Sequence, residues 1–282
     1  MAARRAFASE GSWLIAPALL LLTAGFMGPM LLFFVQTLAG QGGLATLAGR
    51  FAAVLAAEAV TTALSTTLGI SLLVTLAVLV ISYPIAFYMA HRGGLRFTLV
   101  LFCIIVPYFT SIIVRTYAWM VLLGRNGLIN EALMALGVIE QPLDLLYTKT
   151  AVVIGMVYVL LPYMVLTLFA TMKAIDPSLM RAARGLGAGS VYAFRRVYFP
   201  LSLHGVISGS LIVFILAIGF FITPALMGGP ADVMIAMLIE RAVEITLDWP
   251  GAAVMSLVLL GLTLVLYAVY YRVTDLQKMM GS

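Results

Sequence analysis

Residues 176–200 read DPSLMRAARGLGAGSVYAFRRVYFP, a basic stretch between two long apolar segments of the chain. Asp176 followed by Pro177 is typical of a helix start, with a carboxylate at the N-cap and proline at the first helical position. Three alternate glycines then break this helix, and Ser190 is placed to cap a second helix that runs to Pro200. The sequence therefore predicts a helix–turn–helix, here called the basic loop, which favours the docking of a soluble partner.

The composition around the basic loop is that of a membrane protein. Of the 282 residues, 63% are hydrophobic and 10% are charged, and the mean hydropathy is +1.14. Soluble domains are about 45–50% apolar and about 25% charged. The net charge of +5 is better explained by orientation in a bilayer than by nucleic-acid binding. The single cysteine, Cys103, excludes an internal disulfide and a cysteine metal cluster.

Six segments are apolar over the roughly 20 residues that a membrane-spanning helix needs. They are Leu14–Thr37, Thr66–Ala90, Phe97–Leu123, Thr150–Met172, His204–Met227 and Gly251–Arg272. We therefore predict an all-α polytopic membrane protein with about six transmembrane helices. A secretory signal peptide is the alternative for the first segment, but the run from Pro17 to Val35 is long for one and no Ala-x-Ala site closely follows. We expect this segment to be a retained anchor.

The positive charges predict which side of the membrane each loop faces. With the N-terminus in the cytoplasm, eleven of the 16 Lys and Arg residues fall inside, Arg115 lies within a span, and four fall outside: Arg50, Arg125, Lys149 and Arg241. The positive-inside rule then places both termini and the basic loop in the cytoplasm. We divide the chain into an anchor helix with an external loop (1–60), a transmembrane core with a cytoplasmic loop at 173–203 (61–272), and a short cytoplasmic tail (273–282).

Four prolines lie within or near the ends of the predicted spans: Pro84, Pro107, Pro162 and Pro224. Proline removes a backbone hydrogen bond and kinks a helix, which a membrane tolerates where a neighbouring helix or a cavity satisfies the freed carbonyl. Ordinary helix packing explains any single one of them, whereas four together favour a pathway that moves. Between the third and fourth spans, the apolar spacing around Leu128 predicts a short external amphipathic helix.

Catalytic motifs are missing from the sequence. There is no P-loop, no HExxH, no GxSxG and no pair of carboxylates within a span, and the two histidines, His91 and His204, lack a metal-ligand spacing. The chain is thus not predicted to be an enzyme, and energy for transport must come from an ion gradient or a separate ATPase. An ion-coupled carrier would need acids or histidines inside its spans. Arg115 is the clear intramembrane charge, so the separate ATPase is favoured and the carrier stays the alternative.

The basic loop resembles the cytoplasmic loop of permease subunits of type I ABC importers, whose signature is E-A-A-x(3)-G-x(9)-I-x-L-P. Here the pattern is Arg181-Ala182-Ala183, three residues, Gly187, nine residues, then Val197-Tyr198-Phe199-Pro200. The alanines, the glycine, the proline and the spacings fit, while Arg181 stands where the family usually has glutamate. The resemblance implies that Arg181, Ala182, Ala183, Gly187, Val197 and Pro200 couple the chain to an ATPase.

Within this superfamily the chain looks most like the spermidine/putrescine-type permeases, over roughly residues 60 to 272. The segments that carry this resemblance are Pro107–Ser111, Arg115–Tyr117, Asn126–Asn130, Leu160–Tyr163, Thr223–Gly229 and Asp248–Pro250. Permeases for ferric iron, thiamine, opines, aminobutyrate or phosphonates share much of this pattern, so another solute of the same importer class is the alternative.

The resemblance implies a bacterial inner-membrane assembly. Two permease subunits, the second being a different chain, would join two ATPase subunits that bind ATP–Mg and a periplasmic substrate-binding protein. This chain itself would bind no cofactor, metal or nucleic acid. ATP binding would draw the two basic loops together and open the pathway outward.

Two further groups of residues are candidates in such a permease. For the pathway wall they are Arg115, Tyr117, Trp119, Tyr158, Tyr163 and Pro224, although aromatic packing or a membrane-interface belt explains the aromatic ones equally. Because an arginine repels a cation, we prefer a structural pairing or a gate for Arg115. Glu240, Glu244 and Asp248 recur every four residues and would form one acidic face on a helix. This face would attract cations, dock the binding protein, or only be solvated.

Overall fold

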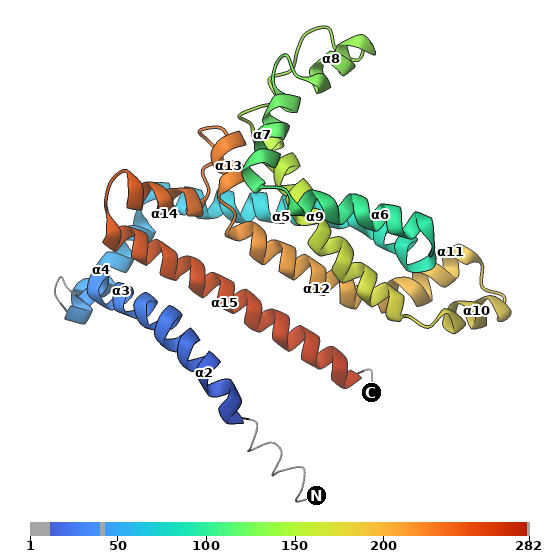
Figure 1. Ribbon diagram of the computed structural model, residues 1–282, viewed down its shortest axis with the longest axis horizontal. Coiled ribbons are helices and arrows are strands. Elements are labelled where there is room, and N and C mark those ends of the chain that lie inside the picture. The colour runs from blue at the N-terminus through green and yellow to red at the C-terminus, as the bar shows by residue number, and fades with distance from the viewer. Residues whose placement is uncertain (1–11, 40–42, 281–282) are drawn as a thin grey trace, which may run out of the picture. The chain divides into compact units, whose positions relative to one another are not determined.

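The computed structural model describes residues 12–39 and 43–280, and every regular element in these ranges is a helix (Figure 1). Arg4 and Arg5, predicted to lie in the cytoplasm, fall outside the described residues. The chain divides into two compact units, one of residues 1–57 with 239–257 and one of residues 58–238 with 258–282. The predicted division into anchor, core and tail was made by position relative to the membrane rather than by compactness, and it stays a prediction.

Three long helices form the centre of the second unit: α5 (Glu58–His91), α9 (Lys149–Ala174) and α12 (Phe199–Ile218). They run alongside one another in Figure 1. Their shared core is apolar, with Val74, Met164 and Val213 fully buried. A Cβ at Gly205 of α12 would lie 2.9 Å from Thr171 of α9. The two backbones therefore approach closely, as small residues permit between helices in a membrane.

The predicted third span, Phe97–Leu123, is not one straight helix. The segment forms α6 (Leu95–Ile105), a 3₁₀ turn (η2, Val106–Phe109) and α7 (Ile112–Leu123), and the chain direction changes by 105° at the break. Pro107 lies in the turn and has no N–H to continue the helical hydrogen bonds, and Thr110 is extended, with ψ 151°. The described residues hold five helices long and apolar enough to span a membrane, or six if this bent pair counts as one.

The fifth span also differs from its prediction at His204–Met227. Helix starts earlier, with α11 (Ser190–Ala193) and a π turn (η3, Phe194–Tyr198) leading directly into α12. It ends at Ile218, and after Gly219 the chain forms a separate short helix, α13 (Ile222–Met227). The apolar run therefore covers two elements. By contrast, the chain stays helical through Pro84 in α5 and through Pro162 in α9.

The helix predicted near Leu128 is confirmed as α8 (Leu128–Ala135), and its external position stays a prediction. The loop after α8 is held by Asn130, which is fully buried. Its amide nitrogen donates to the carbonyl of Leu143 (2.9 Å) and to that of Gly124 (3.1 Å), and its Oδ1 accepts from the Leu143 N–H (2.9 Å). One side chain thus satisfies backbone groups of the segment before α8, at Gly124, and of the segment after it, at Leu143.

The first unit contains α2 (Ser12–Leu22), a π turn (η1, Thr23–Met27), α3 (Gly28–Ala39) and α4 (Gly43–Ala56). It also contains the later part of α14 (Ile235–Glu244) and the start of α15 (Trp249–Met280). Phe33 of α3 packs edge-on against Trp249, with ring centroids 6.0 Å apart. The first predicted span, Leu14–Thr37, is confirmed as one continuous helical run, Ile15–Val35, which contains the π turn. The last predicted span, Gly251–Arg272, lies within the longer α15.

Candidate functional site

The basic loop starts with α10 (Pro177–Gly185), whose predicted N-cap is confirmed. The Asp176 carboxylate accepts a hydrogen bond from the Ser178 N–H at 2.8 Å, and Pro177 occupies the first helical position. The bond from the Ser178 N–H lowers the pKa of the Asp176 carboxyl, since it favours the charged form. The first turn of α10 is therefore fixed by a charged cap at neutral pH.

The turn after α10 is a Schellman motif centred on Gly187. The Gly187 N–H donates to the Arg184 carbonyl (3.0 Å), and the Ala188 N–H donates to the Ala183 carbonyl (3.0 Å). Gly187 has φ +86°, the left-handed conformation that this motif requires and that glycine adopts without strain. Next to it, Leu186 is 90% exposed. The motif glycine thus closes α10 and leaves an apolar side chain in the open at the tip of the loop.

The second helix of the basic loop differs from the prediction in two respects. Gly189 occupies the N-cap of α11 and no side chain caps it, so Ser190 is not the cap. The helix also does not end at Pro200, because the π turn η3 just before it lets the helix continue through the proline. The Phe199 N–H donates to the Phe194 carbonyl, five residues back, and Pro200, which has no N–H to donate, follows at once. The basic loop therefore runs without a break into the membrane helix α12.

The predicted coupling residues are spread over both arms of the basic loop. Arg181, Ala182, Gly187 and Pro200 are exposed, while Ala183 and Val197 are half-buried. The exposed ones share the surface with the apolar side chains of Leu179, Leu186, Val191 and Tyr192. The structure thus brings most of the motif to an open surface with an apolar and basic character.

Two of the predicted wall residues, Arg115 and Tyr163, meet at a cavity of about 310 Å³ between α7, α9 and α12. The guanidinium of Arg115 lies 5.9 Å from the ring centre of Tyr108, and the Tyr108 hydroxyl is hydrogen-bonded to that of Tyr163. Among the described residues, the buried Nε of Arg115 has no hydrogen-bond partner. Arg115 is therefore paired with an aromatic face rather than with a carboxylate.

The other predicted wall residues lie elsewhere. Trp119 packs edge-on against Tyr158, with ring centroids 5.6 Å apart, and Tyr117 is 53% exposed. None of Tyr117, Trp119 and Tyr158 lines the cavity beside Arg115. Pro224 is buried in α13, which packs against α7 and α9. The six candidates thus do not form one wall.

The acidic face predicted from Glu240, Glu244 and Asp248 is not a single helical surface. Glu240 and Glu244 lie on α14, which ends at Glu244, whereas Asp248 caps the start of α15. Its Oδ1 accepts a hydrogen bond from the Gly251 N–H at 3.0 Å. The spacing of four residues therefore continues across a turn, in which Leu247 has φ +52°.

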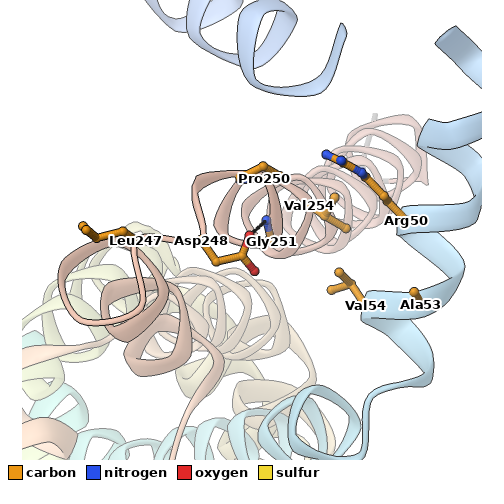
Figure 2. Close-up of a pocket in the computed structure, with 8 residues that line it drawn as sticks. All are labelled: Arg50, Ala53, Val54, Leu247, Asp248, Pro250, Gly251 and Val254. Atoms are coloured by element: carbon orange, nitrogen blue, oxygen red, sulfur yellow. Dashed lines mark hydrogen bonds between the residues drawn. The ribbon is translucent and has the colours of Figure 1, made fainter. Parts of the chain in front are cut away.

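Asp248 lies beside a cavity of about 390 Å³ within the first unit. Figure 2 shows its carboxylate turned back to Gly251, with Pro250 and Val254 following on α15 and Arg50, Ala53 and Val54 presented by α4. The cap bond occupies one oxygen of Asp248, and the side chain remains exposed. Its charge is therefore available at the surface even though it does not share a helix with Glu240.

The family of the chain follows from its sequence. Residues 82–276 match the family described as the inner membrane component of binding-protein-dependent transport systems. The chain belongs to this family. It is a permease of the type I ABC importer class, and such permeases are membrane channel subunits rather than enzymes. The match covers α6 to α14 and most of α15, so it includes the basic loop and the cavity beside Arg115.

Curated relatives of this permease include PotB, the spermidine/putrescine transport system permease protein of Escherichia coli K12. It is 38% identical over 202 residues, which are 72% of this chain and 74% of PotB. The Haemophilus influenzae Rd protein of the same name is 37% identical over 202 residues, 72% of this chain and 71% of its own. The inner membrane ABC transporter permease protein YdcU of Escherichia coli K12 is 32% identical over 197 residues, 65% of this chain and 62% of YdcU.

The fold of this permease matches that of a solved importer. A bacterial ABC transporter that imports the acidic polysaccharide alginate has a chain that superposes with a TM-score of 0.71 over 96% of this chain and 99% of its own. A complex of a bacterial alginate transporter with an alginate-bound periplasmic protein gives 0.72 over 94% and 96%. Both are 16% identical in sequence, so the likeness concerns the fold.

Sequence reasoning missed several residues that shape the candidate site of this permease. Tyr108 and Phe220 line the cavity with Arg115, and each lies next to a break in a helix, at Pro107 and at Gly219. Gly155 of α9 lies against Thr223 of α13, where a Cβ would come within 2.5 Å of the threonine Cγ2. The sequence offers one signal for Tyr108 and Phe220: each aromatic residue directly follows a helix-breaking proline or glycine. Hydropathy alone does not report this pattern.

Proposed function

We propose that the chain is the permease subunit of an ATP-driven importer that takes up a polyamine of the spermidine/putrescine class. The observation that carries this proposal is the 38% identity to PotB over 72% of the chain. The family match over residues 82–276 contains the cavity beside Arg115 and the basic loop. Another solute of the same importer class is the second candidate, since YdcU, which matches over 65% of this chain, is named without a solute.

The proposed assembly has a separate ATPase pair that binds ATP–Mg in the cytoplasm, a second permease subunit and a periplasmic binding protein. The chain carries no P-loop, which supports an ATPase on another chain. The excess of Lys and Arg in the basic loop and the neighbouring segments supports a cytoplasmic position for both termini. The proposed location is the bacterial inner membrane, with multiple crossings.

We also propose that the basic loop couples this permease to its ATPase. The cap at Asp176 and the Schellman turn at Gly187 hold α10 at both ends. The helix after the turn continues from α11 through η3 into α12 without a break. A push on the exposed loop is therefore passed to a membrane helix through a continuous backbone instead of being absorbed by a flexible linker. Leu186, 90% exposed, is the proposed apolar anchor in the ATPase groove.

The cavity beside Arg115 is the proposed pathway element in this chain. Its aromatic faces, Tyr108, Tyr163 and Phe220, suit the ammonium groups of a polyamine through cation–π contact. Arg115 occupies the face of Tyr108 and repels a cation, so it acts as a gate that must move before a polyamine amine can take its place. Selection of the solute then falls to the binding protein, because the spans offer few carboxylates.

Reconstitution tests the proposed function. The permease, purified with the ATPase, second permease and binding protein encoded beside it, is placed in liposomes and given labelled spermidine. We expect uptake that requires ATP and the binding protein. Binding assays on the periplasmic protein, with spermidine, putrescine, thiamine, ferric iron and aminobutyrate compared, identify the solute. Gradient-driven uptake by this chain alone, without ATP, would overturn the proposal.

A further inference from the structure

Another cavity lies beside α10 and shares Arg181 with the predicted coupling residues. It has a volume of about 390 Å³, within the range of about 300–1,000 Å³ that holds small ligands. The ends of two membrane helices form one side of it, with His91 of α5 and Lys173 of α9. Arg181 and Arg184 of α10 form the other side. Three permanent positive charges therefore face one space.

An acidic residue also lines this cavity, but it is already engaged. The carboxylate of Asp176 accepts the Ser178 N–H as the cap of α10. Around His91, Nδ1 lies 2.9 Å from the Phe87 carbonyl, and because a carbonyl can only accept, Nδ1 carries the proton. The balance of charge in the lining remains positive, which favours an anion.

Tyr198 gives the independent sign of a ligand. It lines the same cavity and is 2% exposed, yet its hydroxyl has no hydrogen-bond partner among the described residues. Its ring is fixed by Phe87 (centroids 5.1 Å apart), His91 (5.2 Å) and Phe194 (5.8 Å). The ring cannot swing the hydroxyl toward bulk water without breaking this packing. A buried hydroxyl with no partner needs an explanation, and an acceptor bound in the cavity that Tyr198 lines would supply one.

The depth of the cavity in the membrane identifies the source of the anion. The 34 residues of α5 and the 26 of α9 extend about 51 Å and about 39 Å, beyond the roughly 30 Å of hydrocarbon. Both helices end at this cavity, at His91 and Ala174. It therefore lies at the level of the lipid headgroups, where basic pockets between helices recognise phosphate groups.

We propose that this cavity binds a phosphate group, supplied by the headgroup of an anionic phospholipid. Lys173, Arg181 and Arg184 neutralise its charge, and the Tyr198 hydroxyl donates a hydrogen bond to one of its oxygens. A bound headgroup joins the ends of α5 and α9 to α10. Lipid binding thus braces the basic loop from the membrane side and leaves its outer surface, with Leu186, open.

Native mass spectrometry tests this site without reference to transport. The full chain is released from nanodiscs of phosphatidylcholine alone and from nanodiscs in which phosphatidylglycerol replaces part of it, and bound lipids are identified by mass. We expect retained phosphatidylglycerol, with about tenfold weaker retention for Tyr198→Phe, which removes only the hydroxyl, and at least as large a loss for Lys173→Gln. Tyr88→Phe and Arg92→Gln are the matched controls, since neither residue lines the cavity.

The outcomes separate the sources of the phosphate. Equal retention of phosphatidylglycerol by the chain and by the Tyr198→Phe and Lys173→Gln variants would overturn the site. Inorganic phosphate is added to phosphatidylcholine nanodiscs in a third arm. If it binds and phosphatidylglycerol does not, the lipid source is overturned. Because the readout is lipid mass, a failure here leaves the proposed importer function intact, and a failure of uptake leaves this site intact.

Discussion

Gly187 is the residue on which the geometry of the basic loop depends. Its φ of +86° closes the Schellman turn, and an L-residue pays about 1 kcal/mol to adopt that conformation. Open space surrounds the position, so strain in the backbone rather than a clash opposes a side chain. The motif glycine is thus required for its conformation.

Replacing Gly187 by alanine or valine is expected to loosen the turn, so that ATP hydrolysis by the assembled importer continues while uptake falls. Membrane insertion should be normal. The measurement is the ratio of solute taken up to ATP hydrolysed in proteoliposomes. Gly185→Ala is the control, since it lies within α10 and a Cβ there also meets open space. Normal coupling in Gly187→Val would refute the role of the turn.

Gly155 is small for a different reason. A Cβ there would lie 2.5 Å from Thr223 Cγ2 and 3.0 Å from Met227 Sδ, so α13 packs directly on the backbone of α9. Gly155→Ala should force α13 away, at a cost of about 1–3 kcal/mol, and lower the melting temperature of the purified permease. Gly69→Ala on α5, which meets nothing within 4 Å, should leave it unchanged or raised. Equal melting temperatures for the two variants would contradict this packing.

At the scale of elements, helix content was predictable and helix direction was not. Hydropathy reports that Phe97–Leu123 is apolar throughout, and an apolar run looks the same whether its axis is straight or bent by 105°. Pro84, Pro107 and Pro162 all stand in apolar runs, yet the helix breaks only at Pro107. Whether a proline breaks the helix depends on whether neighbouring groups satisfy the backbone carbonyl that it leaves without a donor. Those neighbours are set by the tertiary structure and cannot be read from a local apolar run.

The acidic residues after α13 illustrate the same limit from the opposite side. A spacing of four residues predicted that Asp248 shares a face with Glu244, but Pro250 two residues later is a helix-start signal that competes with this pattern. In the structure the start signal prevails and Asp248 becomes a cap. For the basic loop, by contrast, the Asp-Pro start was confirmed, because cap signals are local.

The cap at Asp248 allows its charge and its structural role to be tested separately. Asp248→Asn keeps an oxygen for the Gly251 N–H but removes the charge, whereas Asp248→Ala removes both and costs about 1 kcal/mol of helix stability. If the charge attracts a cationic solute, both variants should lower uptake, as should Glu240→Gln with Glu244→Gln. If only Asp248→Ala lowers uptake, the residue is a cap and the carboxylates are merely solvated.

At the scale of the whole molecule, the expected orientation can be measured directly. In a Cys103→Ser background, Leu186→Cys in the basic loop and Asp144→Cys after α8 introduce single thiols at exposed positions. A membrane-impermeant maleimide applied to right-side-out vesicles should label Asp144→Cys only, and inverted vesicles should show the reverse. Labelling of Leu186→Cys from the outside would invert the predicted topology and remove the ATPase from that face.

The π turn at Phe194–Tyr198 fixes the rotation of α11, in the proposed docking surface, relative to α12. A π turn holds one residue more than a regular helix, and one residue turns an α-helix by about 100°. Deleting a residue there would leave α11 and α12 helical but rotate the tip of the loop to another side. In the proposed contact with an ATPase, arginine in place of the motif glutamate changes the chemistry of the surface, whereas a change in chain length would turn that surface to another side.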